Sequence, residues 1–204
     1  MGIKKGIYAA LAYCINIFKR GYHHIITTYQ KNMMSACGKY VFIESHCDGN
    51  WNNIYCGTDI HIGRNNLFMC ALAPIKIGNH VMFGPNVTVI TGDHRTDIVG
   101  KYMTDIRNEE KLPENDQPVV FEGDNWIGAD VTILKGVTVE KGAIIAGGAV
   151  VNHNVPAYAI VAGVPAKVIK YRFTKEQILE HEKKVENKFY YEYYKKSLGR
   201  NLVN

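Results

Sequence analysis

A histidine flanked by two aspartates stands in a polar stretch near the middle of the chain, where His94 follows Asp93 and precedes Asp97. An imidazole has an unperturbed pKa of about 6.5, so at neutral pH it can accept a proton from a reacting hydroxyl. Either aspartate can orient the ring and stabilise the imidazolium, and spacing alone does not decide between them. A lone histidine in a loop is more often only solvated, so a catalytic role for His94 depends on the scaffold that holds it.

Beyond this stretch, apolar residues recur at every sixth position, a spacing that matches neither the helical nor the strand period. The first series consists of Phe121, Ile127, Ile133, Val139, Ile145 and Val151. A second series lies four residues after each of these and consists of Asn125, Val131, Val137, Ala143, Ala149 and Val155. Stacked hexapeptides of this kind form a parallel β-helix. The period therefore predicts an all-β solenoid.

The same register is present upstream of His94, interrupted by one short insertion. Its members are Ile62, Phe68, Ile77, Phe83 and Val89. The segment 92–118 lacks the period, holds two prolines and is rich in polar residues. A loop this long within a compact fold is usually functional or disordered. We therefore expect a solenoid over residues 41–170, from which an excursion loop at 92–118 carries His94 outward.

The N-terminal segment, residues 1–40, is expected to be helical and contains an apolar run at 7–18 that basic residues flank on both sides. Twelve residues are too few to span a bilayer, which needs about twenty. No small-residue cleavage site follows, so a signal peptide is not favoured. Two interpretations stay open: a helix that packs on the end of the solenoid and covers its terminal coil, or an interfacial helix in peripheral contact with a membrane.

At the other end, Thr174 and Gln177 have the spacing of a capping box, which predicts a helix that begins near Lys175 and continues to about Tyr194. Residues 171–204 are accordingly assigned to a C-terminal helix that follows the solenoid.

Composition narrows the classes of function. The formal net charge of +5 is mild and the basic residues alternate with acidic ones, which favours a solvated surface over nucleic-acid binding. Five scattered cysteines without a C-x-x-C pair indicate reduced thiols in a cytoplasmic protein. No paired-histidine spacing supports a zinc site, so no metal is expected.

Two stretches, IGNHVMFGPNVTVITGDH and NWIGADVTILKGVTVEKGAIIAGGAVVNHNVPAYAIVAGVPAKVIK, closely resemble the hexapeptide-repeat O-acetyltransferases. This family includes galactoside, maltose, surface-polysaccharide and xenobiotic acetyltransferases, and the resemblance covers about residues 58–173. It implies a left-handed parallel β-helix, a homotrimer and acetyl-CoA as the acyl donor.

The resemblance also assigns roles to individual residues. His94 matches the catalytic histidine, the general base that removes the proton of the acceptor hydroxyl, with Asp93 as the first candidate for orienting it. Asn66 matches an asparagine at the acceptor site, although a turn asparagine at positive φ is an equal alternative. Trp126 matches a tryptophan beside the acceptor pocket and the pantetheine tunnel.

The cofactor arm is implied to lie in a groove between two subunits, along small residues. Those residues are Gly128, Ala129, Ala146, Gly147 and Gly148. Three basic side chains match positions that meet the nucleotide phosphates, namely His153, Lys167 and Lys170. The family often has Thr-Lys where this chain has Asn152-His153, so the contact at His153 differs from the family pattern. Both substrates can react directly in one tunnel, so no cysteine needs a covalent role.

The leading hypothesis is an acetyl-CoA-dependent O-acetyltransferase that acts on a hydroxyl of a sugar or surface-polysaccharide precursor, in the cytoplasm or at the inner face of the membrane. The main alternative is an antibiotic acetyltransferase, because YRFTKEQI after GVPAKVIK resembles the xenobiotic branch. A non-catalytic β-helix scaffold, and an acyltransferase that uses a carrier protein, are further alternatives.

Overall fold

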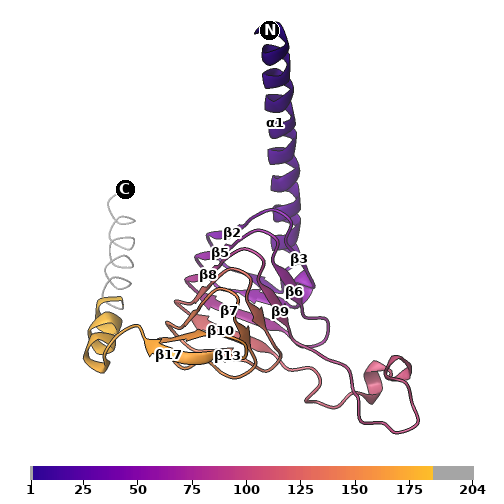
Figure 1. The fold of residues 1–204 in the computed structure, drawn as a ribbon, viewed down its shortest axis with the longest axis vertical. Coiled ribbons are helices and arrows are strands. Elements are labelled where there is room, and N and C mark those ends of the chain that lie inside the picture. Colours follow the sequence, from indigo (N-terminus) through magenta and orange to yellow (C-terminus); the bar gives the residue numbers. More distant parts are fainter. Residues whose placement is uncertain (1, 186–204) are drawn as a thin grey trace, which may run out of the picture. The chain divides into compact units, whose positions relative to one another are not determined.

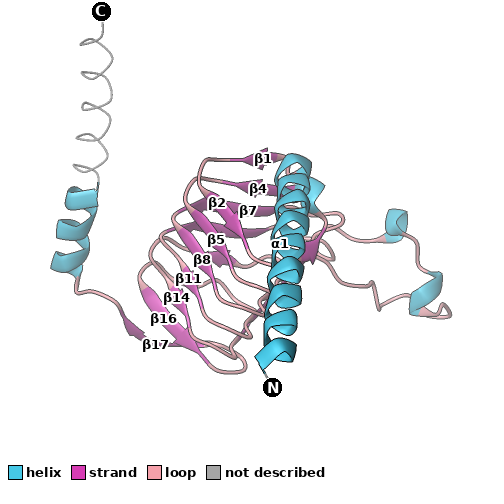
Figure 2. Ribbon diagram, turned by 90° about the horizontal axis from the view of Figure 1, so that it is seen from above, coloured by secondary structure: helices cyan, strands magenta, loops and turns pink. Residues whose placement is uncertain are grey.

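The structure is a computed structural model that describes residues 2–185, with side chains from residue 7 onward. Its central part consists of three parallel sheets, which we name A, B and C (Figures 1 and 2). Sheet A contains β1 (Ala36–Cys37), β4 (Ile54–Cys56), β7 (Ile75–Asn79), β10 (Val119–Gly123) and β13 (Thr138–Val139). Sheet C contains β3 (Asp48–Gly49), β6 (Leu67–Met69), β9 (Thr88–Ile90), β12 (Thr132–Ile133) and β15 (Val150–Val151).

Sheet B has seven strands and includes the last two strands of the described chain. Its strands are β2 (Val41–Ile43), β5 (Ile60–Ile62), β8 (Val81–Phe83), β11 (Trp126–Ile127), β14 (Ile144–Ile145), β16 (Ala159–Ala162) and β17 (Lys167–Tyr171). The chain visits sheets A, B and C in turn, so each circuit adds one parallel strand to each sheet. This arrangement agrees with the repeated parallel coils that the six-residue period predicts.

The periodic residues form the core. All twelve members of the two series between Phe121 and Val155 are at most 1% exposed. They stack on their equivalents one coil away, as where Phe121 lies between Ile77 and Val139 in register. Phe83 packs edge to face against Phe68 and Phe121, with ring centroids 5.7 and 5.0 Å apart. This aromatic column fills the interior between the sheets.

Corners between strands are stabilised by short polar side chains in the left-handed backbone region. Asn65, Asn86 and Asp130 have φ near +60° and form a ladder along successive coils. Asn65 Nδ2 donates to Asn86 Oδ1 at 3.1 Å, and Asn86 Nδ2 donates to Asp130 Oδ1 at 2.9 Å. Asparagine and aspartate tolerate this conformation better than other non-glycine residues, so they recur at the turns.

Helix α1 (Gly2–Met33) contacts the coils only through its last turns. Thr27 and Gln30 are buried there, and α1 adjoins the short helix η1 (Trp51–Asn53). The apolar run at 7–18 is exposed, so the expectation that it packs on the end of the solenoid is wrong. A helix rises 1.5 Å per residue, which places this run well beyond the turns that make contact. No helix among residues 2–185 is both long and apolar enough to cross a membrane.

A second compact unit begins at Tyr171. Its described helix covers residues 175–185, and the predicted capping box is present at its start. Thr174 N donates to Gln177 Oε1 at 2.9 Å, and Gln177 N donates to Thr174 Oγ1 at 3.3 Å. The expected continuation of this helix to Tyr194 lies outside the described residues.

Candidate active site

The excursion loop leaves sheet C after β9 and returns to sheet A before β10, and its two ends are fastened together. Gly92 and Asp116 form an antiparallel bridge, Asp93 N donates to Asn115 O at 2.8 Å, and Gln117 N donates to Thr91 O at 2.8 Å. A side chain at position 92 would have to displace the Asp116 carboxylate, which Gly92 leaves in place. The backbone bonds between the two ends fix the start of the loop, where His94 follows, to the stacked coils. Two short helices, η2 (Met103–Asp105) and η3 (Asn108–Glu110), lie farther along the loop.

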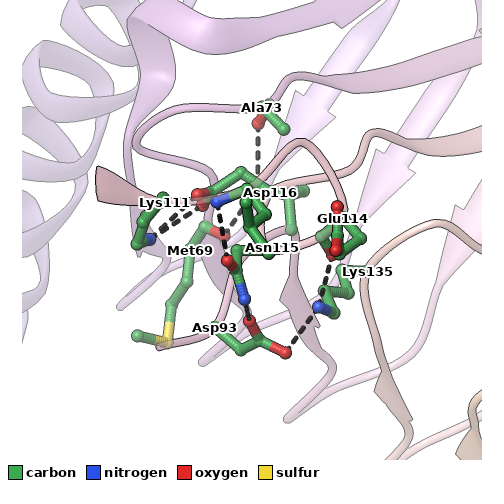
Figure 3. Close-up of polar contacts among 10 residues, drawn as sticks. Met69, Ala73, Asp93, Lys111, Glu114, Asn115, Asp116 and Lys135 are labelled. Atoms are coloured by element: carbon green, nitrogen blue, oxygen red, sulfur yellow. Dashed lines mark hydrogen bonds and ion pairs between the residues drawn. The ribbon is translucent and has the colours of Figure 1, made fainter. Parts of the chain in front are cut away.

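A network of charged side chains strengthens this junction (Figure 3). Asp93 Oδ1 accepts from Asn115 Nδ2 at 2.9 Å, and Asp93 Oδ2 pairs with Lys135 Nζ at 2.5 Å. Lys135 Nζ also donates to Glu114 O at 2.5 Å, which ties coil β12–β13 to the returning end of the loop. Lys111 Nζ pairs with Asp116 at 2.9 Å, and both of these side chains are less than 20% exposed.

These contacts set the charge of Asp93. Partial burial raises the pKa of this carboxyl, but the hydrogen bonds from Lys135 and Asn115 and the charges of Lys135 and Lys111 outweigh it, so the pKa is lowered overall. Asp93 is consequently ionised near neutral pH and acts as the anionic anchor of the junction.

His94 is exposed at the first turn of the loop beyond this anchor. Among residues 7–185, no hydrogen bond or ion pair connects it to Asp93 or Asp97. Asp97 instead accepts from Arg95 Nε at 2.8 Å, a hydrogen bond that lowers the pKa of Asp97. Arg95 Nη1 also donates to Glu110 O at 2.6 Å and so links the two arms of the loop. Orientation of the imidazole by either aspartate stays a prediction, because in this structure both carboxylates have other partners.

Asn66 lies inside the coil and is 1% exposed. Its Nδ2 donates to Gly63 O at 2.6 Å and to Gly84 O at 3.1 Å, and its Oδ1 accepts from Val87 N at 2.7 Å. The alternative of a turn asparagine at positive φ fits its neighbour Asn65 and not Asn66. This geometry favours a role within the coil over contact with an acceptor.

Met69, three residues further along, faces outward. It is 49% exposed, whereas its neighbours Phe68 and Cys70 are fully buried. Met69 O accepts from Thr91 N at 3.0 Å, so this side chain adjoins the base of the loop (Figure 3). Of Phe68, Met69 and Cys70, only Met69 has a side chain that is open to solvent.

Trp126 lies on the outer face of sheet B and is 53% exposed. It is in register with Met82 on one side and Ile144 on the other. His94 comes after strand β9 of sheet C. Between His94 and Trp126, the chain passes through strand β10 of sheet A. The fold does not connect Trp126 and His94 through any interaction among the described residues.

The five small residues expected along the cofactor arm do come together at one corner, between sheets B and C. A Cβ on Gly128 would lie 2.6 Å from Gly147 N, so adjacent coils approach closely here. The N–H groups of Gly128, Ala146 and Gly148 are used between coils, and Gly148 N donates to Ala129 O at 2.8 Å. This corner is a narrow strip without large side chains.

The three residues that are expected to contact the phosphates are all exposed, but they lie in two separate parts of the fold. His153 follows β15 of sheet C, whereas Lys167 and Lys170 lie on β17 of sheet B. Among the described residues, no group of three or more histidine, cysteine or acidic side chains has a geometry that could hold a metal ion.

Sequence reasoning missed the junction network of Lys111, Asn115, Asp116 and Lys135. One signal for it exists: a polar pair stands at each end of the aperiodic segment, Gly92-Asp93 where the period stops and Asn115-Asp116 shortly before it resumes. Polar pairs at the two ends of an excursion can bond to each other.

Known proteins place the chain in a family. No family model matches the chain. It is 31% identical over 140 residues to a galactoside O-acetyltransferase of Lactococcus lactis, which covers 68% of this chain and 63% of that protein. A putative acetyltransferase of Saccharomyces cerevisiae is 30% identical over 144 residues, covering 69% of this chain and 67% of that protein.

A solved structure agrees with these relatives. The hexapeptide-repeat acetyltransferase of Vibrio cholerae in complex with acetyl coenzyme A matches with a TM-score of 0.62 and 29% identity, over 72% of this chain and 76% of that one. The chain belongs to the hexapeptide-repeat acetyltransferases. It spans less than two thirds of the length of the Lactococcus relative.

Proposed function

We propose that the protein is an acetyl-CoA-dependent O-acetyltransferase that acetylates a hydroxyl of a sugar or of a surface-polysaccharide precursor. The observation that carries this proposal is the fastened junction at Gly92–Asp93, which holds the exposed His94 at a fixed place on a hexapeptide-repeat scaffold. The galactoside O-acetyltransferase among the relatives supports a sugar acceptor.

The reaction requires one proton acceptor and two bound substrates. The acceptor oxygen attacks the thioester carbonyl carbon while His94 takes the hydroxyl proton. The new C–O bond forms, the C–S bond breaks, and the departing thiolate takes the proton back from the imidazolium. General-base catalysis of this kind contributes about 10²- to 10⁴-fold to the rate.

Direct transfer is favoured because the buried thiols are poor nucleophiles. Burial raises the pKa of Cys56 to about 12, and of Cys70 to about 11. Since the thiolate is the reactive form, these cysteines stay protonated and inert at neutral pH. The described cysteines are all free, which supports a reducing cytoplasmic location.

We propose a homotrimer of left-handed β-helices in which each site draws residues from two chains. An exposed row crosses sheet B in register and consists of Phe42, His61, Met82, Trp126 and Ile144. Phe42, Met82 and Trp126 are each more than half exposed, and the Phe42 and His61 rings stack at 5.2 Å. Exposed aromatic and aliphatic side chains that gather on a sheet face are typical of an interaction surface. A second chain on this face would bring its His94 loop toward Trp126.

The cofactor is proposed to lie along the corner strip at Gly128 and Gly147, with its acetyl group toward His94. Close-packed small residues leave space for the thin pantetheine arm. Lys167 and Lys170, and His153 from a different sheet, are the proposed contacts of the nucleotide phosphates.

The test uses purified full-length protein, acetyl-CoA and a panel of acceptors. The panel contains free sugars, glycosides and nucleotide sugars, with hydroxylated antibiotics as a second arm. Thiol release is followed together with the mass of each acceptor. The proposal expects thiol release and the gain of one acetyl group on a sugar. Acetylation of the antibiotic arm alone would assign the protein to the xenobiotic class. A folded oligomer that releases no thiol above background with any acceptor would contradict an enzymatic role and favour a scaffold.

A further inference from the structure

Helix α1 carries an exposed apolar stripe that no described part of the chain covers. Its members alternate at spacings of three and four residues and are each 52–80% exposed. They are Tyr8, Leu11, Ile15, Phe18, Tyr22, Ile25 and Tyr29. This spacing places all of them on one face of a helix, away from the buried Thr27 and Gln30.

All charged residues of α1 are basic. Between Gly2 and Met33 there is no aspartate or glutamate, whereas Lys4, Lys5, Lys19, Arg20 and Lys31 are basic. The rest of the chain mixes both signs, so α1 concentrates positive charge beside an apolar stripe. A stripe of aromatic and aliphatic side chains, together with lysine and arginine and without acidic residues, is the composition of helices that lie in a membrane interface.

A groove of about 830 Å³ lies between α1 and the corner at residues 44–47, and basic side chains lie among the apolar and polar groups that line it. Lys19, Arg20 and His23 enter it from α1, and His46 enters it from the corner. Glu44 also borders the groove, but its carboxylate is shared with Arg64 and His61, each at 3.5 Å on the far side. The groove is therefore complementary to an anion.

Gln30 also lines the groove but offers no free group to an occupant. It is only 4% exposed and its Nε2 donates to Cys47 O at 2.9 Å. Its Oε1 has no donor among the described residues and is shielded from solvent. The basic side chains are therefore the groups that can bind the phosphate of an occupant.

We propose that α1 is a peripheral membrane anchor for anionic phospholipid, with the phosphate headgroup in the groove and the stripe in the interfacial region. Tyr22 belongs to the stripe and also lines the groove, so a headgroup in the groove has its acyl chains next to the stripe. Lys19 and Arg20 contact the phosphate. The anchor would hold the enzyme beside membrane-linked acceptors, and it stands independently of the acetyl transfer.

The alternation of three and four also suits a coiled coil between copies of α1. The positive charges of α1 disfavour a coiled coil between copies of the chain. A coiled coil pairs basic with acidic side chains across the flanks of its seam, and α1 offers no acidic partner for Lys19 or Arg20. Association of copies would bring like charges together, whereas an anionic bilayer neutralises them.

Vesicle flotation of the full-length protein tests the proposal. Vesicles of phosphatidylcholine alone are compared with vesicles that also contain phosphatidylglycerol, whose headgroup carries a phosphate and free hydroxyls. We expect binding to the mixed vesicles only, weakening as salt increases. Since each basic side chain at an anionic surface contributes roughly fivefold, the double variant Lys19→Ala/Arg20→Ala should bind about 30-fold more weakly. Lys183→Ala/Lys184→Ala removes the same charge from an exposed pair elsewhere and should bind as the unchanged protein does.

A second variant, Ile15→Ser/Phe18→Ser, separates the stripe from the charge and should also lose most vesicle binding. Equal binding to neutral and mixed vesicles, or none to either, would overturn the proposal. So would an equal loss in the Lys183/Lys184 control. If Ile15→Ser/Phe18→Ser binds vesicles normally but sediments as a smaller species, the stripe joins copies of the chain instead. Binding of soluble glycerol phosphate without any vesicle binding would assign the groove to a free phosphate ester and also overturn the anchor.

Discussion

In the coils between Phe121 and Val155, each residue occupies the same environment as the residue one coil away, whereas in the loop 92–118 hardly any contact recurs. The coils bury one apolar residue after another in register and cap their corners with polar ladders such as Asn65–Asn86–Asp130. The loop has few buried apolar residues and is fixed by particular ion pairs, Asp93–Lys135 and Lys111–Asp116. The repeated coils supply stability. The loop 92–118 interrupts the repeat and holds His94 exposed to solvent.

The largest expected effect lies in the loop. His94→Ala should lower kcat/KM for acetyl transfer by about 10²- to 10⁴-fold, because it removes the proposed base. Its unfolding free energy should change little, since the side chain is exposed. Val99→Ala, at a 99% exposed position of the same loop, serves as the control and should keep full activity. Equal activity in the two variants would remove His94 from the mechanism.

In the coils the largest effect should be on stability. Phe83→Ala should lower the free energy of unfolding by about 3–5 kcal/mol, because it empties the centre of the aromatic column. Leu72→Ala, at a half-exposed position, should change it by no more than about 0.5 kcal/mol. Denaturant unfolding followed by circular dichroism measures both. A loss below about 1 kcal/mol for Phe83→Ala would mean that the core repacks and that the column is not a main source of stability.

More of the fold than of the candidate site could be predicted from the sequence. A six-residue period is a local signal, so the burial of Ile127, Ile133 and Val139 could be predicted from spacing alone. The junction of the loop depends on pairs such as Asp93 and Lys135, which lie 42 residues apart and belong to no period. Asn66 illustrates the same limit: its type suited an acceptor contact, but the coil places its amide inside.

The exposed stripe of α1 was not predicted from the sequence, for a related reason. The stripe continues beyond the apolar run at 7–18 through Tyr22, Ile25 and Tyr29, where polar residues separate its members. Periodicity at spacings of three and four carries this signal, and the run of twelve does not.

A smaller effect is expected at the junction itself. Lys135→Met keeps the aliphatic stem but removes the bonds to Asp93 and Glu114 O, so the start of the loop should loosen. We expect about a tenfold loss in kcat/KM, since small misplacements of a catalytic group are costly. Lys76→Met, at an exposed position of β7, is the matched control and should have no effect. A normal rate for Lys135→Met would show that the junction does not position His94.

The smallest effect concerns pH. The folded-state pKa of Asp93 is lowered, so its contribution to stability is present above the ordinary aspartate pKa, about 3.9, and is lost as the pH falls through the folded value. The side chain is about half exposed, so solvent screening keeps this contribution below about 1 kcal/mol. Unfolding of Asp93→Asn and of the unchanged protein, compared at neutral pH and below pH 4 or so, should differ more at neutral pH. A difference that grows on acidification would contradict the role of Asp93 as an ionised anchor.

The account stands on acetyl transfer at a site shared between chains, with His94 from one and Trp126 from another. Mixed oligomers test this directly: His94→Ala and Trp126→Ala chains, each inactive or nearly so alone, are co-expressed and purified as oligomers of verified mass. Random assembly should then give one intact site for about every four, and so about a quarter of the unmutated activity. Mixed oligomers that remain as inactive as either parent would contradict the account.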